Sequence, residues 1–228
     1  MSNIADKSSG LELLFYSEKY DREYRPSYDW GAATLGDRHE RIADAVWHIP
    51  GWLAPEDALK LYELAYFSTG PILEIGMYCG RSTTILATAV ADRGSAVPII
   101  SIDTDPFALS MTMRSLKMHN VEDRVILACS SIQAFVYAMP SLAPSLVFLD
   151  ADHAEAAVRA DVDTLRQCAQ PGTLLMFHDY LPMVLPETEG FPISVGPIEV
   201  KEAVSGSWIA AEGKFAGTFG ASALFQAT

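Results

Sequence analysis

Short apolar runs that alternate with helical stretches constrain the fold of this chain more than any other feature. The apolar runs cover residues 72–75, 97–102, 125–128, 146–149 and 173–177, and the helical stretches cover residues 82–91, 107–118, 132–138 and 155–168. Strands that are buried on both faces read as continuous apolar runs, and strands that alternate with helices form a parallel sheet covered on both sides. The pattern predicts a doubly wound, mostly parallel α/β fold.

The two ends of the chain differ from this regular middle. A helix begins at Pro55, and near the other end a helix over residues 198–204 precedes two strand-like runs, 207–211 and 221–225, which predict an antiparallel hairpin on the sheet edge. The first fifty residues carry an aromatic stripe from Tyr16 to Trp30. The stripe either packs a surface extension onto the domain or forms a lid over a substrate pocket. We therefore divide the chain into an N-terminal extension, residues 1–50, and one domain, residues 51–228.

Charge and cysteine content narrow the classes of partner. The chain has 16 Lys and Arg against 29 Asp and Glu, a formal net charge of −13. Nucleic acids and anionic membranes bind basic surfaces, so neither is expected as a partner, and a small neutral or cationic ligand is favoured. The chain has an odd number of cysteines and no CxxC spacing, which favours a reducing compartment. Its first residues lack signal-peptide character, and it has no apolar stretch long enough to span a membrane. These features predict a cytoplasmic protein.

A glycine-containing turn follows the first predicted strand, and an acid follows the second. Gly76 and Gly80 let the backbone turn tightly and approach a ligand, and Ser82 is placed to cap the next helix, whose N-terminus offers free N–H groups. Asp103 ends the second strand, where a carboxylate can accept both hydroxyls of a ribose. An ordinary strand-to-helix turn and a helix cap are the alternatives. Turn and acid together favour an adenosine-type ligand.

Acids and histidines follow the fourth and fifth predicted strands. The fourth strand leads into Asp150, Asp152 and His153, and the fifth leads into His178 and Asp179. Parallel strands bring these ends to one edge of the sheet, where carboxylates and imidazoles can bind a divalent cation and supply a general base. The alternative is that the acids cap helices and the histidines bond to loop carbonyls.

Several segments resemble class I S-adenosylmethionine-dependent methyltransferases, and more narrowly the branch of small-molecule and sugar O-methyltransferases. The segments are ILEIGMYCGRST, SIDTD, FLDADH, PGTLLMFHDY and GPIEVKEAV. The resemblance covers roughly residues 50–228. It implies a seven-stranded, Rossmann-like sheet that ends in an antiparallel hairpin, and it implies S-adenosylmethionine as the cofactor.

The resemblance also implies roles for residues that bind the cofactor. Gly76 and Gly80 would cradle its methionine part, with Glu74 beneath the turn and Ser82 at the start of the next helix. Asp103 would hold the ribose. The adenine would lie near the residues that follow the third strand, Ser130 and Ser131, and the cofactor amino group would lie near Asp150.

Metal and base assignments follow from the same resemblance. In metal-dependent relatives, acids at these two strand ends bind Mg²⁺, and the matching positions are Asp150 and Asp179. His178 stands where catechol-type enzymes have an acid, which makes it a third candidate ligand. His153 matches a general base of some sugar O-methyltransferases, and His178 is the competing candidate for that role.

Together these features predict a methyltransferase that acts on a small-molecule hydroxyl, in a sugar or natural product. The alternatives are a NAD- or nucleotide-sugar-dependent oxidoreductase, which needs a GxGxxG turn and a Tyr–Lys pair, and a binding module without catalysis. The chain has no GxGxxG turn. Tyrosines in the extension also favour a homodimer.

Overall fold

The structure is a computed structural model of the chain, and it describes residues 37–181, 183–184, 194–195 and 198–228. The aromatic stripe between Tyr16 and Trp30 lies outside the described residues. The choice between a packed extension and a lid therefore stays open.

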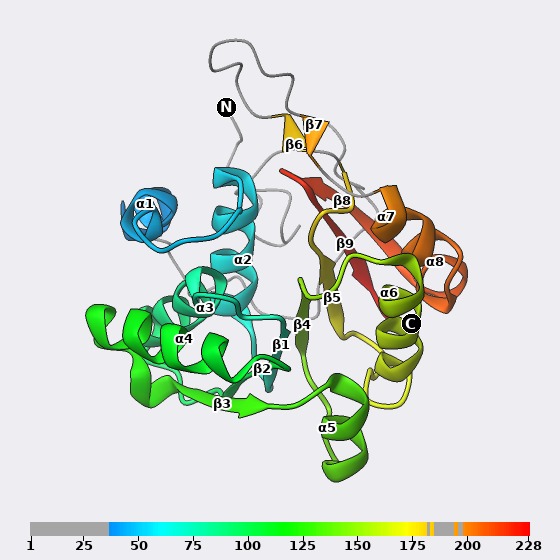
Figure 1. The fold of residues 1–228 in the computed structure, drawn as a ribbon, viewed down its shortest axis with the longest axis horizontal. Helices are drawn as coiled ribbons and strands as arrows, with labels where there is room; N and C mark the ends of the chain where they lie inside the picture. The colour runs from blue at the N-terminus through cyan, green and yellow to red at the C-terminus, as the bar shows by residue number, and fades with distance from the viewer. Residues whose placement is uncertain (1–36, 182, 185–193, 196–197) are drawn as a thin grey trace.

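A seven-stranded sheet forms the centre of the fold (Figure 1). Its order is β3-β2-β1-β4-β5-β9-β8, with β1 to β5 parallel and β9 antiparallel to both β5 and β8. This confirms the predicted doubly wound sheet and its terminal hairpin. The strands are β1 (Ile72–Ile75), β2 (Ile99–Asp103), β3 (Val125–Cys129), β4 (Leu146–Leu149), β5 (Leu174–Phe177), β8 (Lys214–Phe219) and β9 (Ser222–Gln226), and a separate pair consists of β6 (Met183–Val184) and β7 (Ser194–Val195).

Helices cover both faces of the sheet (Figure 1). Successive strand residues point to opposite faces, so Ile72 of β1 belongs to one hydrophobic cluster and Leu73 to the other. The cluster with Ile72 is closed by α1 (Asp37–Val46), α2 (Pro55–Phe67), α3 (Arg81–Arg93) and α4 (Pro106–His119), the last leading through a 3₁₀ turn (Glu122–Arg124) to β3. The cluster with Leu73 is closed by α5 (Ile132–Ala138), α6 (Glu155–Leu165), α7 (Ile198–Ser205) and α8 (Trp208–Glu212).

Two local expectations are wrong. The run over residues 207–211 is not a strand, because Ser207 caps α8 by accepting a hydrogen bond from the N–H of Ile209 at 3.3 Å, and Trp208 donates to the carbonyl of Val162 at 2.8 Å. The hairpin uses the following residues instead. Ser82 does not cap α3 either, since Gly80, in the left-handed region at φ +85°, is the N-cap residue, and Ser82 lies inside the helix.

The strand order reverses between β1 and β4, which are adjacent and parallel, so their carboxyl ends lie at the same edge of the sheet. In open α/β sheets, ligands bind at such a switch point, beyond the carboxyl ends of the strands. The glycine turn after β1 and the acidic ends of β4 and β5 all lie at this edge. In the part of the chain that the structure describes, no helix combines the length and apolar character needed to cross a membrane.

Candidate active site

The turn after β1 needs glycine at two positions. Gly76 has φ +87°, and a Cβ there would lie 2.0 Å from the carbonyl oxygen of Asp150 and 2.8 Å from the Cα of Ala151. A Cβ on Gly80 would lie 2.8 Å from the Cα of Thr112 in α4. The turn is therefore pressed against the end of β4 on one side and against α4 on the other, where no side chain fits.

Asp103 at the end of β2 holds the glycine turn in shape. Its Oδ2 accepts hydrogen bonds from the N–H groups of Met77 at 3.0 Å and Tyr78 at 3.2 Å, and its Oδ1 accepts from the N–H of Asp105 at 3.0 Å. Tyr78 has φ +43°, an unfavourable conformation for a bulky residue, which these bonds help to maintain. The turn uses both acceptor sites of Oδ2, whereas Oδ1 keeps one further site for a ligand.

Glu74 in β1 supports the turn from below. Its carboxyl is fully buried, and Oε2 accepts hydrogen bonds from the hydroxyls of Thr83 at 2.6 Å and Ser101 at 2.5 Å. Burial raises the pKa of Glu74 to about 7. Glu74 lines neither of the two pockets described below, so its part is to brace β1 against β2 and α3.

A groove of about 400 Å³ runs along the carboxyl ends of β1, β2 and β3. That volume falls in the range of small-molecule sites. Among its walls are five of the predicted cofactor residues, Gly76, Asp103, Ser130, Ser131 and Asp150. Asp161 in α6 also lines the groove and accepts a hydrogen bond from the Gln133 amide at 2.7 Å. Asp161, eight residues after the FLDADH segment, is part of the sequence resemblance to methyltransferases, but the resemblance assigned it no role.

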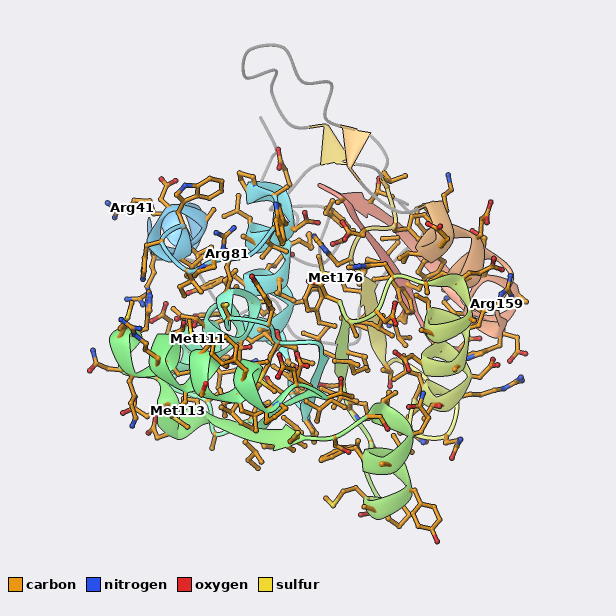
Figure 2. All side chains as sticks on the ribbon, in the orientation of Figure 1. Arg41, Arg81, Met111, Met113, Arg159 and Met176 are labelled. Atoms are coloured by element: carbon orange, nitrogen blue, oxygen red, sulfur yellow. The ribbon has the colours of Figure 1, made fainter. Side chains whose placement is uncertain are left out.

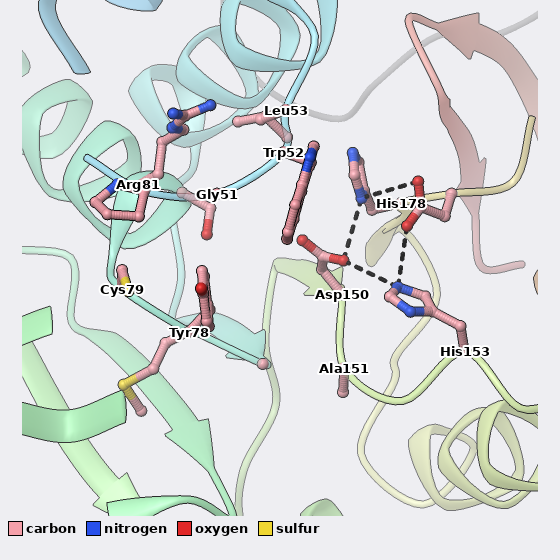
Figure 3. Close-up of a pocket in the computed structure, with 15 residues that line it drawn as sticks. Gly51, Trp52, Leu53, Tyr78, Cys79, Arg81, Asp150, Ala151, His153 and His178 are labelled. Atoms are coloured by element: carbon pink, nitrogen blue, oxygen red, sulfur yellow. Dashed lines mark hydrogen bonds and ion pairs between the residues drawn. The ribbon is translucent and has the colours of Figure 1, made fainter. Parts of the chain in front are cut away.

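A second pocket adjoins the groove beside α3 (Figure 3). The two spaces share Gly76, Tyr78, Asp150 and Ala151. One wall comes from the segment that joins α1 to α2, residues 50–53, which sequence analysis did not assign to the site. Its Trp52 is 70 % exposed and stacks on Tyr78 with ring centroids 6.4 Å apart. A proline, a glycine and a tryptophan before the helix start at Pro55 are the only signal that the sequence offers for this wall.

The strand ends opposite this wall bring together two carboxylates and two imidazoles (Figure 3). The Nε2 of His153 lies 3.0 Å from Oδ2 of Asp179 and 3.4 Å from Oδ1 of Asp150. On the inner side, Nδ1 of His178 lies 3.1 Å from the same oxygen of Asp150 and 3.6 Å from Oδ1 of Asp179. Each histidine thus bridges both acids, one from the pocket and one from the core.

Burial separates the two histidines. The side chain of His178 is 1 % exposed, whereas that of His153 is 40 % exposed and open to the pocket. Burial alone would lower the pKa of His178, but the charge of Asp150 and hydrogen bonds to Asp150 and Asp179 raise it well above its ordinary value. Hydrogen bonds to Asp150 and Asp179 raise the pKa of His153 to about 9. Without a ligand, the neighbouring carboxylates therefore favour the charged form of both imidazoles.

A third acid, Asp57 in α2, lies behind His178. Its Oδ2 is 3.8 Å from Nε2 of His178, and its carboxylate accepts hydrogen bonds from the N–H groups of Ala221 at 3.2 Å and Ser222 at 2.9 Å. It also accepts from the N–H of Ala54 at 3.1 Å and so caps α2. Asp57 is completely buried and lies outside both pockets, so it supports the cluster without reaching a ligand.

Three of these groups could bind a metal ion together. One ligand atom each from Asp150, His153 and Asp179 lies within 4.8 Å of the others. Both nitrogens of His178 face carboxylates in the interior, so the geometry favours His153 over His178 as the third donor. Asp152 lies outside this group and accepts a hydrogen bond from the N–H of Ala154 at 2.9 Å; Ala154 is the N-cap residue of α6, so Asp152 holds the turn before the helix and does not cap it.

Comparison with known protein families decides what this site belongs to. Residues 73–180 match the model of a family described as a methyltransferase domain. The chain carries a methyltransferase domain. The match includes the glycine turn, Asp103 and the strand-end cluster. Together with the sheet order, it confirms the expected class I S-adenosylmethionine-dependent methyltransferase and decides against the dinucleotide-dependent oxidoreductase.

Solved methyltransferase structures share the fold. An O-methyltransferase from Bacillus cereus, in complex with SAH, is 17 % identical, covers 87 % of this chain and 94 % of its own, and has a TM-score of 0.57. The O-methyltransferase TomG from Streptomyces achromogenes, in complex with SAM, is 14 % identical, covers 87 % of this chain and 92 % of its own, and has a TM-score of 0.58. CalS11, a TDP-rhamnose 3'-O-methyltransferase of calicheamicin biosynthesis, is 14 % identical, covers 83 % of this chain and 93 % of its own, and has a TM-score of 0.56. At these identities the likeness concerns the fold.

Most of the predicted site residues line the groove or the second pocket, and the others shape the turn between them. Gly76, Asp103, Ser130 and Ser131 line the groove, Asp150 lines both spaces, and Ser82, His153, His178 and Asp179 line the second pocket. Glu74 and Gly80 shape the turn without lining either space. Ser131 also caps α5 by accepting a hydrogen bond from the N–H of Ala134 at 3.3 Å.

Proposed function

We propose that this methyltransferase transfers the methyl group of S-adenosylmethionine to a hydroxyl of a small-molecule acceptor. The observation that carries the proposal is His153, an exposed imidazole held by two carboxylates where the acceptor pocket adjoins the groove. A hydroxyl has a high pKa and must lose its proton as the oxygen attacks, so a positioned base has a clear role. An amine in its neutral form attacks through its own lone pair and needs no base for that step.

His153 is the base in this proposal, and His178 is its support. The acceptor oxygen would lie in the second pocket, facing the sulfonium methyl group for an in-line displacement. His153 opens to that pocket, whereas His178 is enclosed by Asp150, Asp179 and Asp57. The buried imidazolium of His178 keeps the two carboxylates ionised: burial raises the pKa of Asp150, but the charge of His178 lowers it overall.

The groove would hold the cofactor, with the ribose at Asp103 and the adenine near Ser130 and Ser131. The experiment that tests this is calorimetry with S-adenosylmethionine and S-adenosylhomocysteine, for which we expect micromolar affinity, about −8 kcal/mol. Production of S-adenosylhomocysteine is then measured with a panel of acceptors, among them catechol, simple phenols and methyl glycosides. Binding of a nicotinamide dinucleotide without binding of either sulfur compound would contradict the proposal.

Asp103→Ala is expected to weaken S-adenosylhomocysteine binding by about 30-fold, close to 2 kcal/mol. The substitution removes a charged acceptor for the ribose and also frees the N–H groups of Met77 and Tyr78 that shape the turn. Calorimetry measures the change. Asp123→Ala, which removes an exposed carboxylate beside Arg124, is the matched control and should leave affinity unchanged. Equal affinities for both variants would exclude Asp103 from the cofactor site.

A divalent cation fits the same strand ends. Two carboxylates and one imidazole form a donor set for such an ion; the carboxylates suit Mg²⁺ or Mn²⁺, and the imidazole suits Fe²⁺ or Zn²⁺ better. Asp150 and Asp179 would hold the ion, with His153 as third ligand or as base beside it. When bound, the ion would lower the pKa of the acceptor hydroxyl. The residues themselves orient the acceptor and take up its proton.

Exhaustive chelation is expected to abolish turnover, and Mg²⁺ or Mn²⁺ should restore it. Calorimetry of Mn²⁺ binding to the protein, without any acceptor, gives a readout that does not depend on turnover. Asp179→Asn should remove that binding, whereas Asp152→Asn, on the same strand-end edge but outside the donor group, should retain it. Turnover that survives chelation, together with no Mn²⁺ binding by the intact protein, would leave Asp150 and Asp179 as partners of the histidines only.

The acceptor class follows from charge and from the pocket wall. The chain carries a net charge of −13, which supports a small neutral acceptor over nucleic acid or an anionic membrane surface. The fold likeness to a TDP-rhamnose 3'-O-methyltransferase and to TomG supports a sugar or another natural product. A cytoplasmic location and a homodimer stay predictions from the sequence.

A further inference from the structure

The wall of the second pocket is a segment with few attachments of its own. Residues 50–53 lie between α1 and α2, and within the described residues their backbone makes no hydrogen bond. The side chains of Ile49 and Leu53 are buried in the core at either end of the segment. Trp52 between them is 70 % exposed. Something must therefore fix the backbone if the wall is to keep one position relative to the cofactor groove.

Arg81 makes that connection. It is the first residue of α3, directly after Gly80 in the glycine turn, and it lies among α1, α2 and α3 (Figure 2). Its Nε donates to the carbonyl of Ile49 at 2.7 Å, and its Nη2 donates to the carbonyl of Trp47 at 3.1 Å. The guanidinium carbon also lies 5.1 Å from the centre of the Trp47 ring. The planar guanidinium thus binds two carbonyls and a ring at once.

The segment passes closely over the stem of this arginine. Gly51 has φ +145°, and a Cβ there would lie 3.7 Å from Cβ of Arg81 and 3.9 Å from the Tyr78 ring. Among the described residues, Arg81 has no carboxylate partner, and its charged donors bind the carbonyls of Trp47 and Ile49, just before the segment. One side chain therefore joins the turn that shapes the cofactor groove to the wall of the acceptor pocket.

We propose that Arg81 is a positioning residue that fixes the wall formed by residues 50–53 against the start of α3. The role of this wall in acceptor binding rests on the proposed function. The attachment itself does not, because it can be measured without any acceptor. Loss of the two hydrogen bonds should free the backbone of residues 47–53 while the sheet and the cofactor groove stay intact.

Hydrogen exchange followed by mass spectrometry tests this on the full chain, with S-adenosylhomocysteine affinity measured in parallel by calorimetry. In Arg81→Ala, exchange over residues 47–54 should rise about tenfold at the hydrogen-bonded N–H groups of Trp47, Ile49 and Ala54, as expected for a segment that opens locally, while cofactor affinity changes less than about twofold. Arg81→Lys retains one strong donor and should show an intermediate rate. Failure of the intact protein to bind S-adenosylhomocysteine would count against the proposed function alone.

The matched control lies at the other end of the same helix. Arg93 also donates to two carbonyls, those of Tyr66 at 2.8 Å and Ser68 at 3.0 Å, but far from the pocket. Arg93→Ala should leave exchange over residues 47–54 unchanged. Unchanged exchange in Arg81→Ala would overturn the proposal, since the buried side chains of Ile49 and Leu53 would then suffice. An equal rise in Arg93→Ala would also overturn it, because the effect would be a general loss of stability.

Discussion

His153→Ala is expected to lower the rate of methyl transfer by about 100-fold or more, the usual contribution of a lost general base. The imidazole is the one group of the strand-end cluster that opens widely to the pocket and can accept a proton. Cofactor affinity should stay nearly unchanged, because His153 does not line the groove. Steady-state rates with an acceptor from the screen, and calorimetry with S-adenosylhomocysteine, measure the two effects separately.

The pH dependence sharpens this prediction. Hydrogen bonds to Asp150 and Asp179 raise the pKa of His153 to about 9, so the neutral imidazole that acts as a base forms only as the pH approaches that value. For the intact enzyme, kcat/KM should therefore rise with pH up to about 9 and then level off. A bound divalent cation would compete with the proton and move this rise to lower pH.

Two other histidines serve as controls for the rate. His119→Ala changes a residue that stacks on His48, lies outside both pockets and should not alter turnover. His178→Ala should slow transfer through loss of the cation behind Asp150, and it should also lower stability, since it leaves Asp57 without its charge partner. Normal turnover in His153→Ala, with the rate loss confined to His178→Ala, would show that the base is assigned to the wrong residue.

Gly76→Ala is expected to cost about 3 kcal/mol or more of folding stability and about 100-fold or more in cofactor affinity. The new methyl group would meet the carbonyl oxygen of Asp150 at 2.0 Å, and neither this oxygen nor the Cα that carries the methyl group can easily move, because β1 and β4 fix the backbone on both sides. To relieve this contact, the turn must move away from the groove. Thermal unfolding should show a lower Tm by about 6–12 °C, and calorimetry should show the loss of binding.

Gly94→Ala separates backbone strain from this collision. Gly94 also has a positive φ, +68°, but a Cβ there would meet no atom within 4 Å. We expect a loss of about 1 kcal/mol from strain alone, with cofactor affinity unchanged. If Gly76→Ala were no more destabilising than Gly94→Ala, the turn after β1 would accommodate a Cβ, and the predicted collision with Asp150 would be wrong.

The sheet was predictable because its signal is local. Each parallel strand is buried on both faces, so apolar runs such as 72–75 and 146–149 mark β1 and β4 to the residue. The run 207–211 misled because small and apolar residues suit a strand as well as a buried helix, and only the cap at Ser207 and the contact of Trp208 with α6 decide between them.

The site was only partly predictable, because its geometry depends on contacts between distant segments. Motifs placed Asp150, His153 and Asp179 at neighbouring strand ends, but they did not predict the hydrogen bonds to Asp150 and Asp179 that raise the pKa of His153 away from neutrality. The wall at residues 50–53 and its attachment to Arg81 join positions 32 and 34 residues apart, and no periodicity or spacing encodes such a pair.

The carboxylate of Asp57 also dictates when the site can form during synthesis. It joins α2 to the N–H groups of Ala221 and Ser222, which lie 164 and 165 residues further along the chain. A nascent polypeptide can build β1 to β5 early, but it cannot enclose the imidazole of His178 until β9 has left the ribosome and paired with β5. Such distant pairing is slow to form. The growing chain therefore acquires its complete strand-end cluster only after β9 has been synthesised.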